Sequence, residues 1–233
     1  MTKRKLERFE EMKTFPNVLE PKFHEVFQTD YKLKGRWRED VFRNNNPVIL
    51  ELGCGKGEYT VNMSKNFPSY NFIGIDIKGA RMWRGAKKAL EDNLQNALFL
   101  RTRIDFITSF FEEDEIDEIW ITFPDPQPKK ARKRLMSKMF LSRYQQFVKD
   151  KGIIHLKTDN YDLYHYTGEI IKLNNLNLIH DHTDIHGTKD ESLQMLRTIK
   201  TFYEEQFIEQ NKTIKYLAFN LDKNKILKEP DNE

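Results

Sequence analysis

The sequence predicts an α/β fold in which a mainly parallel sheet lies between two layers of helices. Short apolar segments rich in β-branched and aromatic residues alternate with segments whose apolar side chains recur at helical spacing. A glycine-rich turn follows the first of these apolar segments, and acidic side chains follow several of them. This alternation is typical of β-α-β units, whose strands pair in parallel through right-handed crossovers.

The bulk properties fit a single domain of this kind. The chain has 233 residues and a formal net charge of +3, but the charge is unevenly spread. Residues 112–118 contain six acidic side chains, and a dense cationic segment follows them, so that a near-neutral total hides a basic face of the type that binds nucleic acid. The single cysteine excludes an internal disulfide. Because we find no apolar run of signal or membrane-span length, we expect a cytoplasmic protein.

The expected elements can be placed by residue range. We predict helices over residues 58–66, 79–93, 161–173 and 192–209, and a further helix carrying the apolar stripe Met136, Phe140, Tyr144 and Phe147. We predict seven strands: Val48–Leu52, Tyr70–Asp76, Ala97–Arg101, Glu118–Phe123, Gly152–Thr158, Leu176–Asp181 and Ile214–Leu221.

The segment before the first strand differs in character. We expect residues 1–46 to be a basic N-terminal extension, residues 47–222 the core domain and residues 223–233 a tail, because Asn44-Asn-Asn-Pro47 is a strong breaker. Within the extension, Leu6, Phe9 and Met12 lie at helical spacing, so residues 2–13 fit an amphipathic helix. The same residues equally fit a basic arm that orders only on a partner.

The glycine-rich turn, Glu51-Leu-Gly-Cys-Gly-Lys-Gly57, is the first indication of chemistry. Gly53, Gly55 and Gly57 allow a sharp strand-to-helix turn and a close approach of a ligand to the backbone. Their G-x-G-x-G spacing differs from the G-x-G-x-x-G of dinucleotide folds, which disfavours a nicotinamide oxidoreductase. Glu51 suits hydroxyls and an amine better than a phosphate, and Asp76 at the end of the second strand can accept both hydroxyls of a ribose.

This order of strand, loop, helix, strand and terminal acid resembles class I S-adenosylmethionine-dependent methyltransferases. The resemblance implies a Rossmann-like three-layer sandwich with a mostly parallel seven-stranded sheet and an antiparallel last strand. By the same analogy Asp105, just past the third strand, would lie near the adenine amine. A helix N-cap is an equally good interpretation of Asp105.

The stretch from Glu118 to Arg134 is where we expect the reaction to take place. A buried strand ends at Phe123, and Pro124, Pro126 and Pro128 then stop any regular structure. Asp125 therefore lies on a stiff turn, which loses little entropy when a planar partner docks. The cations that follow are Lys129, Lys130, Arg132, Lys133 and Arg134. A rigid carboxylate beside such a patch suits a ligand that is part base and part polyphosphate.

Taken together, the motifs resemble the tRNA (guanine-N7-)-methyltransferase family from about Tyr31 to Leu221. The proline-rich motif and the Lys-Thr-Asp motif, in this order, are more specific than the glycine turn. The residues that carry the resemblance are Lys34-Gly-Arg-Trp37, Glu51-Leu-Gly-Cys-Gly-Lys-Gly57, Phe72-Ile-Gly-Ile-Asp76, Phe123-Pro-Asp-Pro-Gln-Pro-Lys-Lys130, His155-Leu-Lys-Thr-Asp-Asn160 and Thr201-Phe-Tyr-Glu204.

The resemblance implies a role for each matched position. Asp125 would be the active-site acid at the border of donor and guanine, and S-adenosylmethionine would be the methyl donor. Two positions depart from the family pattern: Gln127 replaces a Trp and Asp76 replaces a Glu. The first departure removes an aromatic platform. The residues implied to contact the donor are Glu51, Gly53, Gly55, Gly57, Asp76, Asp105 and Asp125, and those implied to hold tRNA are Lys129, Asp159, Thr201, Phe202, Tyr203 and Glu204.

Several alternatives stay open from the sequence. The chain also fits a methyltransferase that acts on another amine or ring nitrogen, or a non-catalytic RNA-binding subunit with the same fold. Either Asp125 or Asp159 could read the guanine edge, and Asp159 also fits a helix N-cap. His180, His182 and His186 lack good metal-ligand spacing, so we expect no metal. We expect a monomer or homodimer without an obligate partner protein.

Overall fold

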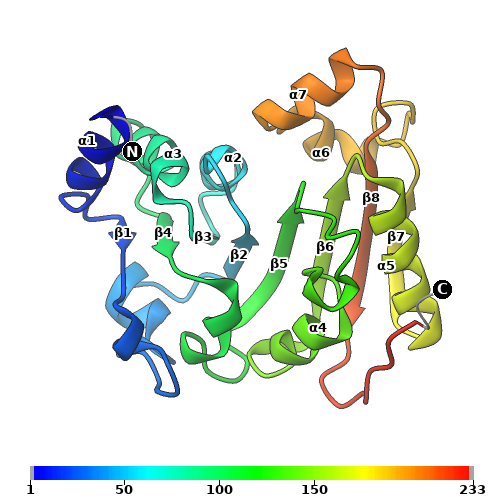
Figure 1. Ribbon diagram of the computed structural model, residues 1–233, viewed down its shortest axis with the longest axis horizontal. Helices are drawn as coiled ribbons and strands as arrows, with labels where there is room; N and C mark the ends of the chain where they lie inside the picture. Colours follow the sequence, from blue (N-terminus) through cyan, green and yellow to red (C-terminus); the bar gives the residue numbers. More distant parts are fainter. Residues whose placement is uncertain (1–2, 231–233) are drawn as a thin grey trace. The chain divides into compact units, whose positions relative to one another are not determined.

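The computed structural model describes residues 3–230 and divides into two compact units, Met1–Glu112 (unit 1) and Glu113–Glu233 (unit 2). Figure 1 shows the helices and strands of both units. Among the described residues, no helix combines the length and apolar character needed to cross a bilayer.

Unit 1 is built on four parallel strands. Its strand order is β1-β4-β3-β2, and each neighbouring pair is parallel. The elements are α1 (Lys3–Met12), β1 (Val18–Leu19), a 3-10 helix (Phe23–Glu25), a π-helix (Trp37–Phe42), β2 (Val48–Leu52), α2 (Glu58–Asn66), β3 (Asn71–Asp76), α3 (Gly79–Glu91), β4 (Ala97–Arg101) and a second 3-10 helix (Ile104–Ser109).

Close packing between the glycine turn and α3 positions the start of α2. Every residue of β2 is buried, as expected of a parallel strand covered on both faces. A Cβ added at Gly57 would lie 2.5 Å from the Phe99 ring, and one added at Gly85 would lie 2.6 Å from the carbonyl oxygen of Lys56. Only glycine fits at both places, so the turn and α3 approach one another backbone to backbone.

The N-terminal helix α1 packs on α3, and Figure 1 shows the two side by side. Met12 is 1% exposed and belongs to an apolar cluster with Ala86. The indole N–H of Trp83 donates to Glu11 (2.8 Å), and Lys87 Nζ lies 2.8 Å from the same carboxylate. The prediction of an amphipathic helix is confirmed for Lys3–Met12. The predicted division into 1–46, 47–222 and 223–233 stays a prediction.

Unit 2 combines one parallel and two antiparallel strand pairings. Its order is β5-β6-β8-β7, with β5 and β6 parallel and β8 antiparallel to both neighbours. The elements are β5 (Ile116–Thr122), a 3-10 helix (Ala131–Lys133), α4 (Lys138–Tyr144), β6 (Val148–Thr158), α5 (Tyr161–Leu173), β7 (Asn177–His182), a 3-10 helix (Glu191–Leu193), α6 (Gln194–Thr198), α7 (Phe202–Glu209) and β8 (Lys215–Leu221).

The structure confirms most of the predicted elements and corrects two. Each of the seven predicted strands corresponds to one of β2 to β8, and the antiparallel last strand is confirmed. The two-residue strand β1 was too short to be predicted. The prediction of one helix over residues 192–209 is wrong, because the chain leaves α6 at Ile199 and begins α7 after Thr201. The helix predicted around Met136 to Phe147 is shorter, and α4 contains only Lys138–Tyr144.

Candidate active site

The glycine turn in unit 1 has the backbone conformation that its sequence requires. Gly53, Gly55 and Gly57 all have positive φ, at 78°, 55° and 70°. A Cβ added at Gly53 would meet no heavy atom within 4 Å, whereas one at Gly57 would collide with Phe99. Gly57 is therefore a packing glycine, and Gly53 leaves room for a ligand to approach the backbone.

The carboxylates of Glu51 and Asp76 are held on either side of this turn. Glu51 is 5% exposed, and its Oε2 accepts hydrogen bonds from the amide N–H (2.9 Å) and the hydroxyl of Thr60. Asp76 Oδ2 accepts from the Gly55 amide (2.9 Å), and Oδ1 accepts from the Lys78 amide (2.7 Å). Both acids lie at the carboxyl ends of adjacent parallel strands, where ligands of α/β sheets bind.

Asp105 follows β4, the next strand in the order, and lies in the 3-10 helix Ile104–Ser109. Its side chain is 47% exposed and its Oδ2 lies 3.4 Å from Arg103. The N-cap position of this helix is Arg103, so the N-cap interpretation of Asp105 is wrong. Three acids therefore lie at or beyond the carboxyl ends of three neighbouring parallel strands of unit 1.

One candidate in this unit was missed by the sequence reasoning. Ile77, directly after Asp76, is 50% exposed although it is a large apolar residue. An exposed isoleucine beside a carboxylate offers apolar surface to a flat ring. The one sequence signal for Ile77 as a site residue was its position directly after Asp76, the acid that ends β3.

In unit 2, the proline-rich loop is held in a strained conformation around Asp125. Phe123 and Gln127, on either side, have φ values of 48° and 46°, which side chains other than glycine rarely adopt. Asp125 is exposed, and its Oδ1 accepts a hydrogen bond from the Gln127 amide (3.0 Å). Arg134 Nε donates to the Pro126 carbonyl (3.0 Å), which further restrains the loop. Backbone strain of this kind concentrates at functional sites.

Two of the cations that follow the loop, Lys129 and Arg134, line a broad hollow beside α5. The hollow has a volume of about 970 Å³, and its lining also includes Tyr161, His165 and the acids Asp162 and Glu169. The Arg134 guanidinium lies 4.4 Å from the centre of the Tyr166 ring. Lys129 is exposed, so its ammonium group is available to a polyanion.

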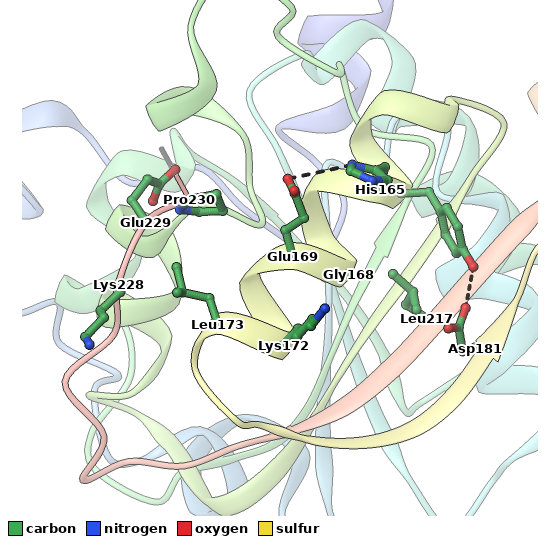
Figure 2. A pocket seen from close by; sticks show the side chains of 11 residues that line it. His165, Gly168, Glu169, Lys172, Leu173, Asp181, Leu217, Lys228, Glu229 and Pro230 are labelled. Carbon is green, nitrogen blue, oxygen red and sulfur yellow. Dashed lines mark hydrogen bonds and ion pairs between the residues drawn. The ribbon is translucent and has the colours of Figure 1, made fainter. Parts of the chain in front are cut away.

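A second hollow of about 890 Å³ runs along the outer face of α5, and Figure 2 shows its lining. Its charges are mixed, since Lys172 and Lys228 line it together with Glu169, Asp181 and Glu229. His165 pairs with Glu169 across one turn of the helix at 3.6 Å. None of the predicted site residues lines this hollow.

Asp159 lies after β6, at the same edge of unit 2 as Asp125. The parallel register pairs Thr122 with Lys157, so Asp125 lies three residues beyond this pair on its strand and Asp159 two residues beyond it on the neighbouring strand. Asp159 Oδ2 lies 3.2 Å from Lys212 Nζ. The N-cap of α5 is Asn160, whose side chain accepts from Leu163 N at 2.8 Å, so the N-cap interpretation of Asp159 is wrong.

The stretch Thr201–Glu204 begins α7, and its four residues have different environments. Thr201 is the N-cap, and its hydroxyl accepts from the Glu204 amide at 3.2 Å. Phe202 is 40% exposed and Tyr203 is half-buried, whereas Glu204 is fully buried. The packing of Phe207 on Phe123, with ring centroids 5.7 Å apart, places α7 at the end of β5. The pattern Thr-x-x-Glu is typical of a helix start, so the sequence did contain a signal for the break before α7.

Comparison with known proteins identifies the family. A family model described as "Putative methyltransferase" matches residues 45–217. A tRNA (guanine-N(7)-)-methyltransferase of Porphyromonas gingivalis is 48% identical over 224 residues, covering 95% of this chain and 89% of that protein. One of the same name from Bacteroides fragilis is 45% identical over 233 residues, covering 100% of this chain and 92% of that protein. This chain belongs to the tRNA (guanine-N7-)-methyltransferase family.

The fold agrees with that membership. The crystal structure of the 16S rRNA methyltransferase KamB matches with a TM-score of 0.61 at 13% identity, covering 79% of this chain and 92% of that one. Identity this low shows the fold alone, and the fold is that of the class I methyltransferases. The resemblance to the tRNA (guanine-N7-)-methyltransferase family is therefore confirmed, and with it the membership of a methyltransferase family.

Proposed function

We propose that this protein transfers a methyl group from S-adenosylmethionine to N7 of a guanine in the variable loop of tRNA. Its membership of the tRNA (guanine-N7-)-methyltransferase family over the whole chain supports this proposal. We also propose that it acts in the cytoplasm, as a monomer or homodimer, without an obligate partner protein.

The residues of unit 1 fit the methyl donor. Gly53 leaves open space beside the backbone, and Asp76 is oriented by two amide hydrogen bonds that leave its remaining lone pairs for ribose hydroxyls. Glu51 provides negative charge for an amine, and Asp105 and Ile77 provide a polar and an apolar surface for adenine. S-adenosylmethionine supplies an electrophilic methyl group on a sulfonium sulfur.

The reaction requires little from the protein beyond aligning donor and guanine and stabilising the positive charge that develops on the purine. Guanine N7 carries an in-plane lone pair and no proton, so no general base is needed to create the nucleophile. As the bond from N7 to the methyl carbon forms, the bond from that carbon to sulfur breaks and the purine gains positive charge. Alignment of the reactants and a fixed carboxylate near the ring both lower the barrier.

Asp125 in unit 2 is the side chain we assign to that carboxylate. The observation that supports this assignment best is the strained loop, because Phe123 and Gln127 hold an exposed acid in place at the end of β5. Asp125 is also included among the donor contacts implied by the family. Asp159 follows the neighbouring strand, so either acid could accept the N1 and exocyclic amine protons that distinguish guanine from adenine.

The remaining residues of unit 2 would hold tRNA. Lys129 offers an exposed cation for a phosphate, which positions a nucleic acid without reading its sequence. The stretch Thr201–Glu204 presents Phe202, an exposed aromatic ring on which an unstacked base can pack. Because Gln127 stands where the family pattern has Trp, other aromatic side chains would have to stack on the base.

The decisive experiment incubates the purified protein with labelled S-adenosylmethionine and an unmodified tRNA transcript, followed by nucleoside analysis. We expect 7-methylguanosine from the wild type and none from Asp125→Ala, which should still bind the donor. Asp150→Ala is the matched control, because Asp150 is exposed on the same unit, at the opposite end of β6 from Asp159. Wild-type turnover in Asp125→Ala would remove that residue from the mechanism.

The same assay separates the competing functions. A different methylated nucleoside would indicate another RNA base methyltransferase. Tight tRNA binding without transfer, together with no donor binding in calorimetry, would indicate a non-catalytic RNA-binding subunit.

A further inference from the structure

The break between α6 and α7 is formed around a buried lysine. Lys157, near the carboxyl end of β6 in unit 2, is fully shielded from solvent, and so is Glu204 in the first turn of α7. Lys157 Nζ lies 2.8 Å from Glu204 Oε2. The two residues are 47 positions apart in the chain, so only the folded structure brings them together.

The same ammonium group also binds the end of α6. Lys157 Nζ donates to the carbonyl oxygens of Leu196 (2.7 Å) and Ile199 (3.1 Å). A positive charge is favourable at the carboxyl end of a helix, where carbonyl groups lack intrahelical partners. One lysine thus stabilises the end of α6 and, through Glu204, the beginning of α7.

Glu204 connects a third segment to this pair. Its Oε1 lies 2.9 Å from Nε2 of His186, whose side chain is 22% exposed. Glu204 is the third residue of α7 after the N-cap Thr201, a position where a negative charge is favourable. Because Glu204 is 0% exposed and its two oxygens lie within ion-pair distance of Lys157 and His186, its carboxylate is shielded from a ligand at the surface.

We propose that Lys157 and Glu204 form a positioning pair, which holds the first turn of α7 so that Phe202 and Tyr203 meet the tRNA, and that Glu204 itself does not touch tRNA. This inference rests on the proposed function and assigns a role within the substrate-binding stretch. It departs from the family resemblance, which would place all four residues of Thr201–Glu204 against the substrate.

The burial of the pair explains why neither partner can be lost alone. Burial lowers the pKa of Lys157, and the Glu204 carboxylate opposes that shift. A buried charge left without its partner is costly, so the side chain or the segment that carries it moves toward water. We therefore expect loss of either partner to release the start of α7.

Three variants test the proposal: Lys157→Met, Glu204→Gln and the double variant. We expect each single change to raise the KM for tRNA about tenfold, with kcat and donor affinity close to the wild type. We expect the double variant to be no worse than the weaker single one, because the two residues act as a unit. Lys172→Met is the control, since Lys172 is an exposed lysine on α5 of the same unit.

The rival hypothesis, that Glu204 contacts tRNA directly, predicts a different result. In that case Glu204→Gln raises the KM and Lys157→Met does not, because a fully buried lysine cannot contact RNA. That result, or a fall in kcat with unchanged KM, would overturn the proposal.

A second measurement covers the possibility that Lys157→Met does not fold. Hydrogen exchange at the Glu204 and Glu205 amides, measured without tRNA, should be faster in Glu204→Gln than in the wild type, and unchanged exchange contradicts the positioning role. A wild-type protein that does not methylate tRNA would instead count against the proposed function, so the two failures are distinguishable.

Discussion

The amide N–H of Gly55 donates a 2.9 Å hydrogen bond to Oδ2 of Asp76, joining the glycine turn after β2 to the end of β3. This bond fixes the carboxylate relative to the turn, 21 residues earlier in the chain. Asp76 is shorter than the Glu that the family pattern has at this position. The hydrogen bond from the Gly55 amide orients this shorter side chain toward the glycine turn.

Asp76→Ala should weaken donor binding by about 10-fold to 100-fold, because it removes an acceptor of charge-assisted hydrogen bonds worth roughly 1.5–3 kcal/mol. Calorimetric titration with S-adenosylmethionine measures the affinity. Glu91→Ala is the control on unit 1, since Glu91 is an exposed acid at the end of α3. If Asp76→Ala bound S-adenosylmethionine as tightly as the wild type, Asp76 would not be the ribose-binding residue.

Gly57→Ala should destabilise the protein more than Gly53→Ala. Both positions have positive φ, which costs a residue with a side chain about 1–2 kcal/mol. Only at Gly57 would the added methyl group lie 2.5 Å from the Phe99 ring, which adds roughly 1–3 kcal/mol of overpacking. Unfolding by denaturant gives both free energies. Equal losses of unfolding free energy in the two variants would mean that the Phe99 ring moves away from the added methyl group without cost.

Met12→Ala should lower the free energy of unfolding by roughly 2–5 kcal/mol, because Met12 is buried in the cluster that joins α1 to α3. Leu6→Ala on the same helix should change it by less than about 0.5 kcal/mol, since Leu6 is 52% exposed. If instead residues 2–13 order only on a partner, the two variants will be equally stable in the absence of tRNA.

The buried His155 should make stability depend on pH. Its ring stacks on Trp120 with centroids 3.8 Å apart, and its Nδ1 lies 2.8 Å from the Tyr216 hydroxyl. Burial lowers the pKa of His155, and Glu118 partly opposes the shift. Below about pH 6.5 the unfolded chain therefore takes up a proton that the folded chain does not, and stability falls by up to about 1.4 kcal/mol per pH unit.

The measurement is the free energy of unfolding between pH 8 and about pH 5. We expect His155→Gln to be less stable at pH 8 but to lose less stability as the pH falls. A wild-type slope in His155→Gln would show that other groups cause the acid sensitivity.

Lys129→Ala should weaken tRNA binding and reduce its salt dependence. A lysine that contacts one phosphate contributes about 0.7–0.9 to the slope of log affinity against log salt concentration. Binding measured over a range of salt concentrations gives that slope. Lys138→Ala is the control, since Lys138 is an exposed lysine at the start of α4. An unchanged slope would count against a phosphate contact at Lys129.

The sequence alone determined strands β2 to β8, the glycine turn and the proline-rich loop of this protein. Local rules are sufficient for these features: β-branched runs such as Val48–Leu52 form strands, and a positive φ at Gly53 requires glycine. The motifs around Asp125 also identified the family before any contact was known. Sequence reasoning placed Asp105 and Asp159 correctly after their strands, but it could not choose between a ligand role and an N-cap.

Only the tertiary structure decided which polar side chains are buried against one another. The Thr201-x-x-Glu204 pattern signals a helix start within residues 192–209, but no local signal reveals that Lys157 donates to the carbonyl oxygens of Leu196 and Ile199. Glu204 and Lys157 form an ion pair because β6, α6 and α7 meet inside unit 2. The physical reason is that burial and charge pairing depend on long-range contacts, whereas turns and strand propensity depend on neighbours in the chain.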